Sequence, residues 1–332
     1  MNAKSPTVLG LDIGGANLKA ATAAQRAVSM PFALWKQPDA LPAALASLAA
    51  QFPGIDEFAV TMTGELCDCY ATKREGVNRI LDAVEFAAAG RPVRIWGTGG
   101  NWLSVAEARI RTLEVAASNW HALATFAGRF APTGAGLLID IGSTTTDIIR
   151  LKQGRPIIDG RTDFDRLGSG ELVYVGVKRT PIMALGLPNL CAEYFADVRD
   201  IHIVIDRAPE EDAATDTADG RPATRACSMA RLARMLGGDM ETLGETEIAN
   251  FANRSFQRLT AIIANAVWNA FQRLREDGLP TVIMAGSGDW ILRDVIPELP
   301  NAIISLAAEL GPEISACAPA YAVAVLASEM PR

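Results

Sequence analysis

The sequence predicts an α/β protein with two lobes of similar construction that face each other across a central cleft. The chain has 332 residues, 49% of them hydrophobic, which is enough for one large or two ordinary domains. One pattern occurs twice: VLGLDIGGANLKAA at 8–21 and LLIDIGSTTTDIIRL at 137–151 each lead from an apolar strand through Asp-Ile-Gly and small polar residues into a second strand. Because one copy starts each half, the two halves are expected to be built alike.

The first half alternates segments typical of strands and helices. The strand at 8–13 and the apolar segment at 18–23 are separated by glycines, which predicts a hairpin. A helix is expected over 41–51, because this Ala- and Leu-rich stretch is followed by Phe-Pro-Gly. A buried strand at 57–66 runs into a turn, and 76–90 has the three-to-four apolar spacing of a helix that ends at its final glycine.

A junction is expected between the two halves. The segment 92–100 predicts a strand and a glycine loop, and the alanine-rich stretch 101–130 is expected to be helical over much of its length. The sequence APTGAG then predicts a domain boundary. We therefore assign 1–130 to the first lobe and 131–316 to the second, and expect a closing helix at 317–332 to pack back on the first lobe.

The second half begins with the strand, turn and strand at 137–151 and continues through a polar loop region at 159–181. Helices are expected from residue 225 onward, followed by a strand, a glycine turn and a helix start at 279–292. The acidic insertion near 209–224 is rich in turn-forming residues and is expected to be a mobile surface loop. Its length would also suit a lid.

The composition excludes several classes of protein. The formal net charge is -7 and no Lys/Arg cluster is present, which argues against nucleic-acid binding. We find no membrane-spanning segment and no signal-peptide pattern, so a cytoplasmic protein is expected. The five cysteines suit reduced thiols. Cys67 and Cys69 could form half of a metal site, but no second Cys pair follows and His121 and His202 are the only histidines, so small side-chain packing is the preferred interpretation.

Both Asp-Ile-Gly turns have the composition of a phosphate site. An Asp at the end of a buried strand, followed by Gly, lets the backbone turn sharply and direct N–H groups at an anion, while hydroxyls add donors and the carboxylate can hold a cation through water. Either turn alone suits an ordinary hairpin, but two copies favour phosphate with magnesium. The P-loop spacing is absent. The candidates are Asp12, Gly14, Gly15, Asn17 and Lys19, then Asp140, Gly142, Ser143, Thr144, Thr145, Thr146 and Asp147, and in a weaker third turn Gly286, Ser287 and Gly288.

Two further segments carry candidate site residues. The first ends a buried strand, where ligands bind in open α/β sheets, and its alternative is a simple turn. The second, GRTDFDR, is either a solvated loop with surface ion pairs or a loop that contacts substrate. The residues concerned are Thr61, Thr63, Gly64 and Glu65 in the first segment, and Arg161, Thr162, Asp163 and Arg166 in the second.

Aromatic and basic residues nearby have two interpretations each. Trp96, Trp102 and Trp120 could stack on a ring of a ligand, but aromatic side chains in alanine-rich helices more often belong to the core. His121 fits a hydrogen-bonded helix residue better than a catalyst. The basic pair at 178–179 could reach a phosphate or face water.

The paired hairpins, the helical stretch between the halves and the late glycine turn resemble the actin, sugar-kinase and chaperone-ATPase superfamily, which implies a two-lobed actin-like ATPase fold of the duplicated ribonuclease H type. Six further strings resemble the hydantoinase/oxoprolinase branch of it, in particular small single-chain members of methanofuran biosynthesis and tetrahydromethanopterin-linked one-carbon transfer. They are DIGGANLKAA, VTMTGELCD, SNWHALA, DIGSTTTDI, GRTDFDRLGSGELVYVGVKRTP and RLARMLGGD, and they extend over 12–239.

This resemblance implies a transferase that joins an aminomethylfuran-methyl diphosphate to the phenol oxygen of a (glutamyl)tyramine or tyrosine derivative and releases diphosphate. The two hairpins would hold the diphosphate, so ATP would not be required. Lys19 and a magnesium held by Asp12, Asp140 or Asp163 would stabilise the leaving group. The base that accepts the phenol proton would be Glu65, Asp163 or Glu171. The expected partners are these small molecules, with no nucleic acid or membrane and a possible homo-oligomer.

Two other classes remain open at the level of the sequence. An ATP-dependent small-molecule kinase or a hydantoinase/oxoprolinase-type amidohydrolase would use the same aspartates and threonines to hold ATP and magnesium. A non-catalytic, chaperone-like regulatory ATPase would need a partner-binding module beyond the two lobes, and the chain ends soon after the third glycine turn. The transferase remains the leading prediction.

Overall fold

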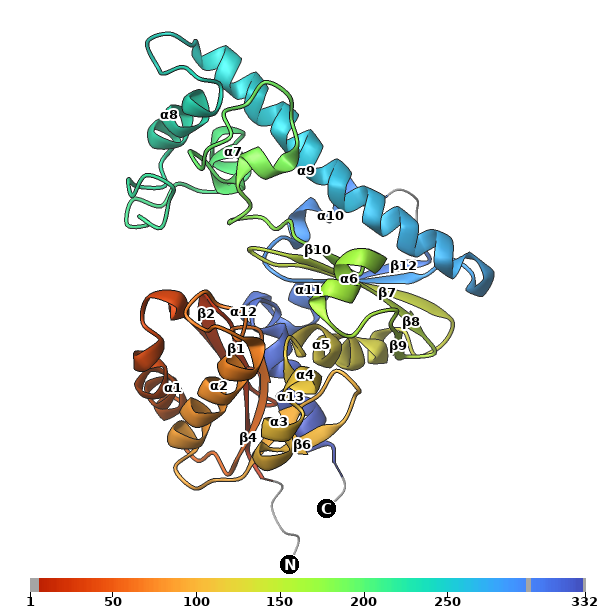
Figure 1. Cartoon of the computed structure of the whole chain (residues 1–332). Coiled ribbons are helices and arrows are strands. Elements are labelled where there is room, and N and C mark those ends of the chain that lie inside the picture. The colour runs from red at the N-terminus through yellow and green to blue at the C-terminus, as the bar shows by residue number, and fades with distance from the viewer. Residues whose placement is uncertain (1–5, 297–299, 331–332) are drawn as a thin grey trace, which may run out of the picture.

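Two α/β lobes make up the structure, a computed structural model that describes residues 6–296 and 300–330 (Figure 1). The first lobe has a six-stranded sheet in the order β3-β2-β1-β4-β5-β6. In it β1 pairs antiparallel with β2 and parallel with β4. The strands are β1 Val8–Ile13, β2 Asn17–Thr22, β3 Arg26–Pro31, β4 Glu57–Met62, β5 Val93–Trp96 and β6 Trp102–Ser104.

The second lobe repeats this arrangement around β7. Its sheet has the order β10-β8-β7-β11-β12, with β9 paired to β8, and β7 again lies between an antiparallel hairpin partner and a parallel strand. The predicted duplicated α/β fold is confirmed by this shared topology. The strands are β7 Ala135–Ile141, β8 Thr146–Lys152, β9 Arg155–Ile157, β10 Leu172–Val173, β11 Thr281–Ala285 and β12 Ala302–Ser305.

Helices cover the outer face of each sheet. In the first lobe α1 and α2 pack on the side chains of alternate strand positions such as Leu9, Leu11 and Ile13. In the second, the 30-residue α9 buries one stripe that includes Leu259 and Ile263 and runs along the lobe (Figure 1). Among the remaining helices, α7 and α8 pack on each other and on α9. The bounds are α1 Leu41–Ala50, α2 Lys73–Ala88, α3 Val105–Ile110, α4 Thr112–Val115, α6 Asp163–Ser169, α7 Val198–Val204, α8 Arg225–Met235, α9 Glu245–Leu274 and α10 Leu292–Val295.

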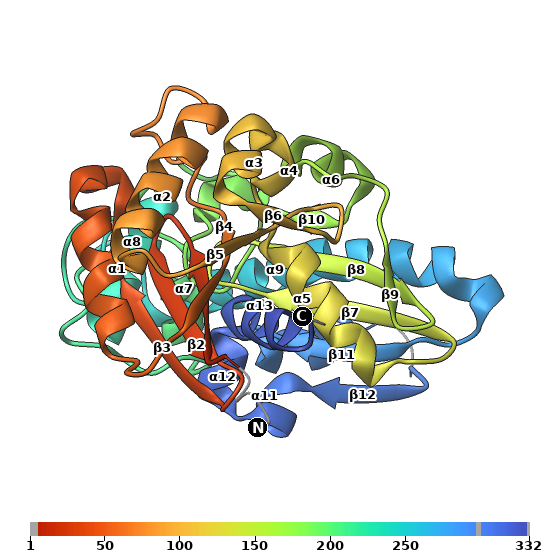
Figure 2. The same ribbon diagram turned by 90° about the horizontal axis from the view of Figure 1, so that it is seen from below.

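Two helices lie side by side between the sheets, α5 Asn119–Ala127 and α13 Ala318–Ser328 (Figures 1 and 2). The helix α13 follows α11 Leu306–Leu310 and α12 Pro312–Ala316 and packs against β1, β2 and β4. It comes so close to β1 that a Cβ at Gly10 would overlap with the Ala320 carbonyl. In turn α5 contacts β8 and β9. The boundary at 130 and 131 stays a prediction, and residues 331–332 of the expected closing helix lie outside the described residues.

Local signals explain where the structure differs from the expected elements. The helix expected over 76–90 begins at Lys73, because the Thr72 hydroxyl accepts a hydrogen bond from Glu75 N at 3.1 Å. The stretch 101–130 is helical over much of its length, as predicted, but in separate pieces, since Ala117 has a left-handed φ of 48°. The expected polar loop at 159–181 contains α6 and β10.

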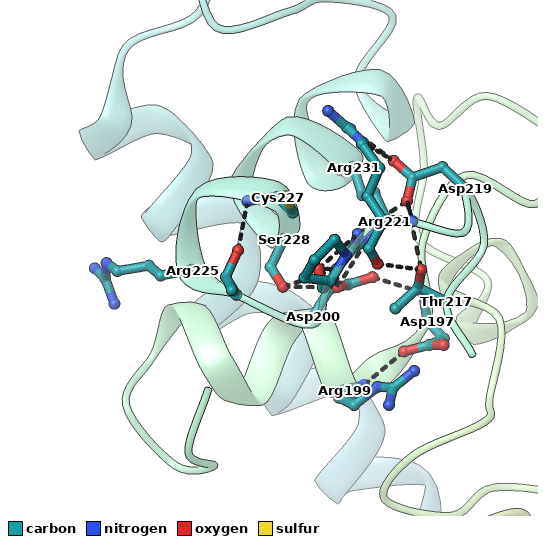
Figure 3. A network of polar contacts seen from close by, with 12 residues as sticks. Asp197, Arg199, Asp200, Thr217, Asp219, Arg221, Arg225, Cys227, Ser228 and Arg231 are labelled. Carbon is teal, nitrogen blue, oxygen red and sulfur yellow. Dashed lines mark hydrogen bonds and ion pairs between the residues drawn. The ribbon is translucent and has the colours of Figure 1, made fainter. Parts of the chain in front are cut away.

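The insertion near 209–224 is attached to α8 by the ion pair of Asp219 with Arg231 (Figure 3), and a second ion pair attaches it to α7. The guanidinium of Arg199 binds Asp216, and that of Arg231 binds Asp219 at 3.0 Å and Asp200 at 2.7 Å. Because Arg231 and Asp200 are almost fully buried, these contacts fix one side of the insertion. Of the helices that the structure describes, none is long and apolar enough to cross a membrane.

Candidate functional site

The two predicted hairpins form equivalent turns at the ends of β1 and β7. In the first, Gly14 N donates to Asn17 O at 3.1 Å, and in the second Gly142 N donates to Thr145 O at 2.8 Å. Cross-strand pairing sets Asp12 opposite Lys19 and Asp140 opposite Asp147. Charged side chains therefore lie beside each turn, at the C-terminal ends of β1 and β7.

Strand alternation directs these side chains into the space between the lobes. Gly10 lies against α13, so Asp12, two residues later, occupies the same face of β1. Leu138 belongs to the apolar core between the sheets, so Asp140 shares that face of β7. The acidic ends of the two hairpins therefore meet although 128 positions separate Asp12 from Asp140 in the sequence.

Burial and mutual repulsion dominate the electrostatics of this meeting point. The pKa of Asp140 is raised to about 7, chiefly by burial and also by the charges of Asp147 and Asp12, while Lys19 acts in the opposite direction. Burial likewise raises the pKa of Asp12, against the effect of Lys19. Asp12 Oδ1 is buried and has no hydrogen-bond partner within residues 6–296 and 300–330. The charges of Asp12, Asp140, Asp147 and Lys19 therefore influence one another, and the predicted binding of magnesium and diphosphate at this point stays a prediction.

Asp147 is held by Arg166, which is 1% exposed. The Arg166 Nη2 atom lies 2.5 Å from Asp147 Oδ1, and its guanidinium stacks over the Trp120 ring at 4.0 Å. Burial raises the pKa of Asp147, and Arg166 opposes that shift. The Arg166 guanidinium thus has internal partners, and its predicted contact with substrate stays a prediction.

The third glycine turn closes against the second hairpin. Gly288 N donates to Ile141 O at 2.9 Å, and Gly286 has a φ of 86°. A Cβ at Gly286 would overlap with the Ile141 carbonyl and with Asp140 Oδ1. This turn therefore packs directly against Asp140. The close approach and the positive φ explain why a glycine stands at position 286, independently of the predicted contact with a ligand.

The segment after β4 supports the first hairpin. Thr63 N and Gly64 N both donate to Ile13 O at 2.9 Å. Thr61 Oγ1 shares a hydrogen bond of 2.8 Å with Ser118. A Cβ at Gly15 would lie 2.6 Å from Cys67 Sγ, so this thiol packs against the turn.

Glu65 ends this segment as a buried carboxylate without a partner. It is 1% exposed, and neither carboxylate oxygen has a hydrogen-bond partner among the described residues. Burial raises its pKa to about 7, and Lys73 lowers it only in part. A carboxylate of this kind is suited to taking up a proton near neutral pH.

An ion pair connects the lobes beside Glu65. Lys73 Nζ of α2 lies 3.3 Å from Asp163 Oδ2 of α6. Lys73 was not among the predicted site residues, because nothing in ATKREG distinguishes it from a surface lysine at a helix start. A second contact between the lobes is the Arg179 guanidinium over the Trp35 ring at 4.9 Å.

Several residues that were predicted to contact substrate make hydrogen bonds within the protein. Glu171 accepts hydrogen bonds from Asp159 N at 2.8 Å and Gly160 N at 3.0 Å, so it holds the loop that precedes α6. Thr162 caps α6, and Thr146 Oγ1 donates to Val175 O at 2.7 Å. Their predicted contacts with substrate remain untested.

The side chains of Ser143 and Thr144 stay half-buried at the tip of the second hairpin. Ser143 O accepts hydrogen bonds from Lys178 N at 3.0 Å and Arg179 N at 2.8 Å. The Lys178 ammonium lies 3.2 Å from Asp216 of the insertion. The basic pair at 178–179 thus follows the hairpin turn closely, with its side chains bound to Asp216 and Trp35.

Known proteins resemble this chain over most of its length. A model of the hydantoinase/oxoprolinase family matches residues 56–330. The chain is 38% identical over 330 residues to a (4-{4-[2-(gamma-L-glutamylamino)ethyl]phenoxymethyl}furan-2-yl)methanamine synthase of Methanocaldococcus jannaschii, covering 96% of this chain and 97% of that one. It is 34% identical over 207 residues to a synthase of the same name from Methanococcus vannielii, covering 57% of this chain and 89% of that one.

A solved structure supports the fold independently. Acetone carboxylase in a nucleotide-free state matches with a TM-score of 0.52 at 11% identity, covering 97% of this chain and 70% of that one. At this identity the match concerns the fold alone.

Proposed function

We propose a function from the premise that this chain belongs to the hydantoinase/oxoprolinase family. It is a synthase of methanofuran biosynthesis that condenses an aminomethylfuran-methyl diphosphate with the phenol oxygen of a (glutamyl)tyramine or tyrosine derivative. The observation that carries this proposal is the 38% identity to the Methanocaldococcus jannaschii synthase over 96% of the chain. On this proposal the diphosphate binds between the turns of the two hairpins.

The reaction replaces one carbon–oxygen bond with another. The bond between the furan methylene carbon and the diphosphate oxygen breaks, and its electron pair leaves with the diphosphate. The phenol oxygen bonds to that carbon, and the phenol proton passes to a base. Because negative charge develops on the diphosphate, Lys19 and the backbone N–H groups of the turns would stabilise the departing anion. ATP is not required, since the substrate already carries its leaving group.

The carboxylates between the hairpins suit magnesium held through water. Asp12 has a buried oxygen without a partner, and its charge influences the pKa of Asp140. Among the residues described, no three His, Cys, Asp or Glu side chains are arranged to hold a metal ion by themselves. Magnesium usually takes one or two carboxylates together with waters and substrate phosphates, which this arrangement permits. When bound, the ion would neutralise charge on the leaving diphosphate.

Glu65 is the base that we assign to the phenol proton. Its carboxylate is buried and unpartnered, with a pKa of about 7, whereas the phenol has an ordinary pKa of about 10. Asp163 is the weaker candidate, because its Oδ2 atom forms an ion pair with Lys73 Nζ at 3.3 Å. The oxygens of Glu171 are taken by the backbone of the 159–160 loop. Glu65 therefore keeps the freest carboxylate of the three.

The test is to incubate the purified protein with magnesium, the furan diphosphate and γ-glutamyltyramine, and to measure the ether product by mass spectrometry and released diphosphate in parallel. Both products should appear in equal amounts without ATP, and Asp140→Asn should reduce both. Absence of the ether together with consumption of ATP would contradict the proposal and favour a kinase or an amidohydrolase.

A further inference from the structure

The Arg161 guanidinium, just before α6, has no partner in the structure. Among residues 6–296 and 300–330 it makes no hydrogen bond or ion pair, although the loop around it is well fixed. Glu171 holds Asp159 and Gly160 on one side, and Thr162 caps α6 on the other. An exposed guanidinium on a fixed loop is arranged to bind an anion from outside.

A glycine loop of the first lobe faces this guanidinium. The loop follows β5 and is closed by Gly97 N donating to Asn101 O at 2.9 Å. A Cβ at Gly99 would lie 3.9 Å from Arg161 Nη1, and one at Gly100 would lie 3.1 Å from His121 Cε1. The atom nearest to the Gly99 Cβ position is Asn101 Oδ1 at 2.9 Å, so the Asn101 side chain, Arg161 and His121 all border this loop.

The Nε2–H group of His121 is a second hydrogen-bond donor near this loop. Trp96 Nε1 donates to His121 Nδ1 at 3.3 Å, and because an indole nitrogen can only donate, Nδ1 must accept. Burial lowers the pKa of His121 to about 4, with Arg161 and Arg166 acting in the same direction, so the ring is neutral at pH 7. Its proton is therefore on Nε2, which would lie 3.8 Å from a Cβ at Gly100 and thus faces the glycine loop.

We propose that Arg161 and the His121 Nε2–H, on either side of the glycine loop, bind the carboxylate of the acceptor substrate's tail. This inference rests on the proposed function. A planar carboxylate matches a guanidinium and a neutral N–H donor. The relatives' printed name contains a γ-glutamylamino group, whose α-carboxylate is the anion in question.

Different charged neighbours distinguish this subsite from the proposed diphosphate site. The carboxyls of Asp12 and Asp140 are influenced by Lys19, and Arg161 is not among the groups that shift their pKa. Glu65 is influenced by Asp163, which is two residues from Arg161. The assigned base thus lies near the Arg161 loop, as required when the phenol is between the leaving group and the tail.

The experiment measures binding by calorimetry, with magnesium and diphosphate present, of γ-glutamyltyramine and of tyramine, which lacks the carboxylate. The wild-type protein should bind γ-glutamyltyramine at least about tenfold more tightly. Arg161→Gln should lose this preference while its affinity for tyramine and for the furan diphosphate stays within about twofold. The matched control is Arg155→Gln, another exposed arginine of the second lobe, which should behave like the wild type.

Three outcomes would overturn the inference: equal affinity for the two acceptors, no binding of either, or a loss of furan diphosphate binding in Arg161→Gln. The outcomes are separable from those of the proposed function. Arg161-dependent binding without ether formation would leave the subsite standing and reject the synthase. Ether formation with no dependence on the carboxylate would do the reverse.

Discussion

Replacing Arg231 with methionine should destabilise the second lobe by about 3–5 kcal/mol, because it leaves a buried carboxylate without its partner. Arg231 is 0% exposed and Asp200 is 1% exposed. Arg231 Nε and Nη2 lie 2.9 and 2.7 Å from Asp200 Oδ1, and Nη1 lies 3.0 Å from Asp219 (Figure 3). At about 2–4 °C per kcal/mol for a lobe of this size, the melting temperature should fall by about 10 °C.

Thermal unfolding followed by circular dichroism measures this change. Arg111→Met is the control, because Arg111 is 50% exposed and lies 3.6 Å from Glu114, so its loss should cost less than about 1 kcal/mol. The double variant Arg231→Met with Asp200→Asn should regain part of the stability, since it removes the buried negative charge of Asp200 that Arg231→Met leaves without a counterion. If the double variant melts no higher than Arg231→Met, or if Arg231→Met behaves like the control, the reasoning is refuted.

Three further results are expected. Because burial is the main cause that raises the Asp140 pKa to about 7, the folded protein holds this proton more tightly than the unfolded chain and loses stability as the pH rises from about 4 to about 7. In urea unfolding, Asp140→Asn should match the wild type at pH 4 and exceed it by up to about 4 kcal/mol at pH 8. Glu65→Gln should lower kcat about 10²–10⁴-fold and abolish the rise of kcat/KM with pH near 7, whereas an unchanged pH profile would exclude Glu65 as the base. Gly286→Ala should cost at least about 2 kcal/mol and displace Asp140, while the helical Gly168→Ala, which meets open space, should not destabilise.

The strand periodicity and the repeated turns made the fold predictable from the sequence. The apolar runs of β1 and β7, and the Asp-Ile-Gly motif at the end of each, are formed by neighbouring residues and can be recognised without the tertiary structure. The same repeated motif identified Asp12 and Asp140 as candidate site residues. It could not identify Lys73, whose significance depends on Asp163 in the other lobe, 90 positions away in the sequence.

Packing also decided what the charged residues do. GRTDFDR reads as one polar stretch, but Arg166 is buried on Asp147 and Trp120 while Arg161 is left exposed and unpaired. Likewise nothing in the sequence distinguishes Glu171, which holds a loop, from Glu65, whose carboxylate oxygens accept no hydrogen bond from the residues that the structure describes. These roles follow from distances between segments, and such distances have no periodic signature in the chain.

By itself the sequence determined the duplicated α/β architecture, the two turns and the resemblance to a family, because strand alternation and short motifs are encoded by neighbouring residues. Only the tertiary structure decided which of those residues meet. The packing of α5 and α13 between the sheets brings Asp12 and Asp140 close enough to influence each other, and the ion pair of Lys73 with Asp163 connects the two lobes. Contacts across such separations are set by the packing of whole elements, which no local pattern specifies.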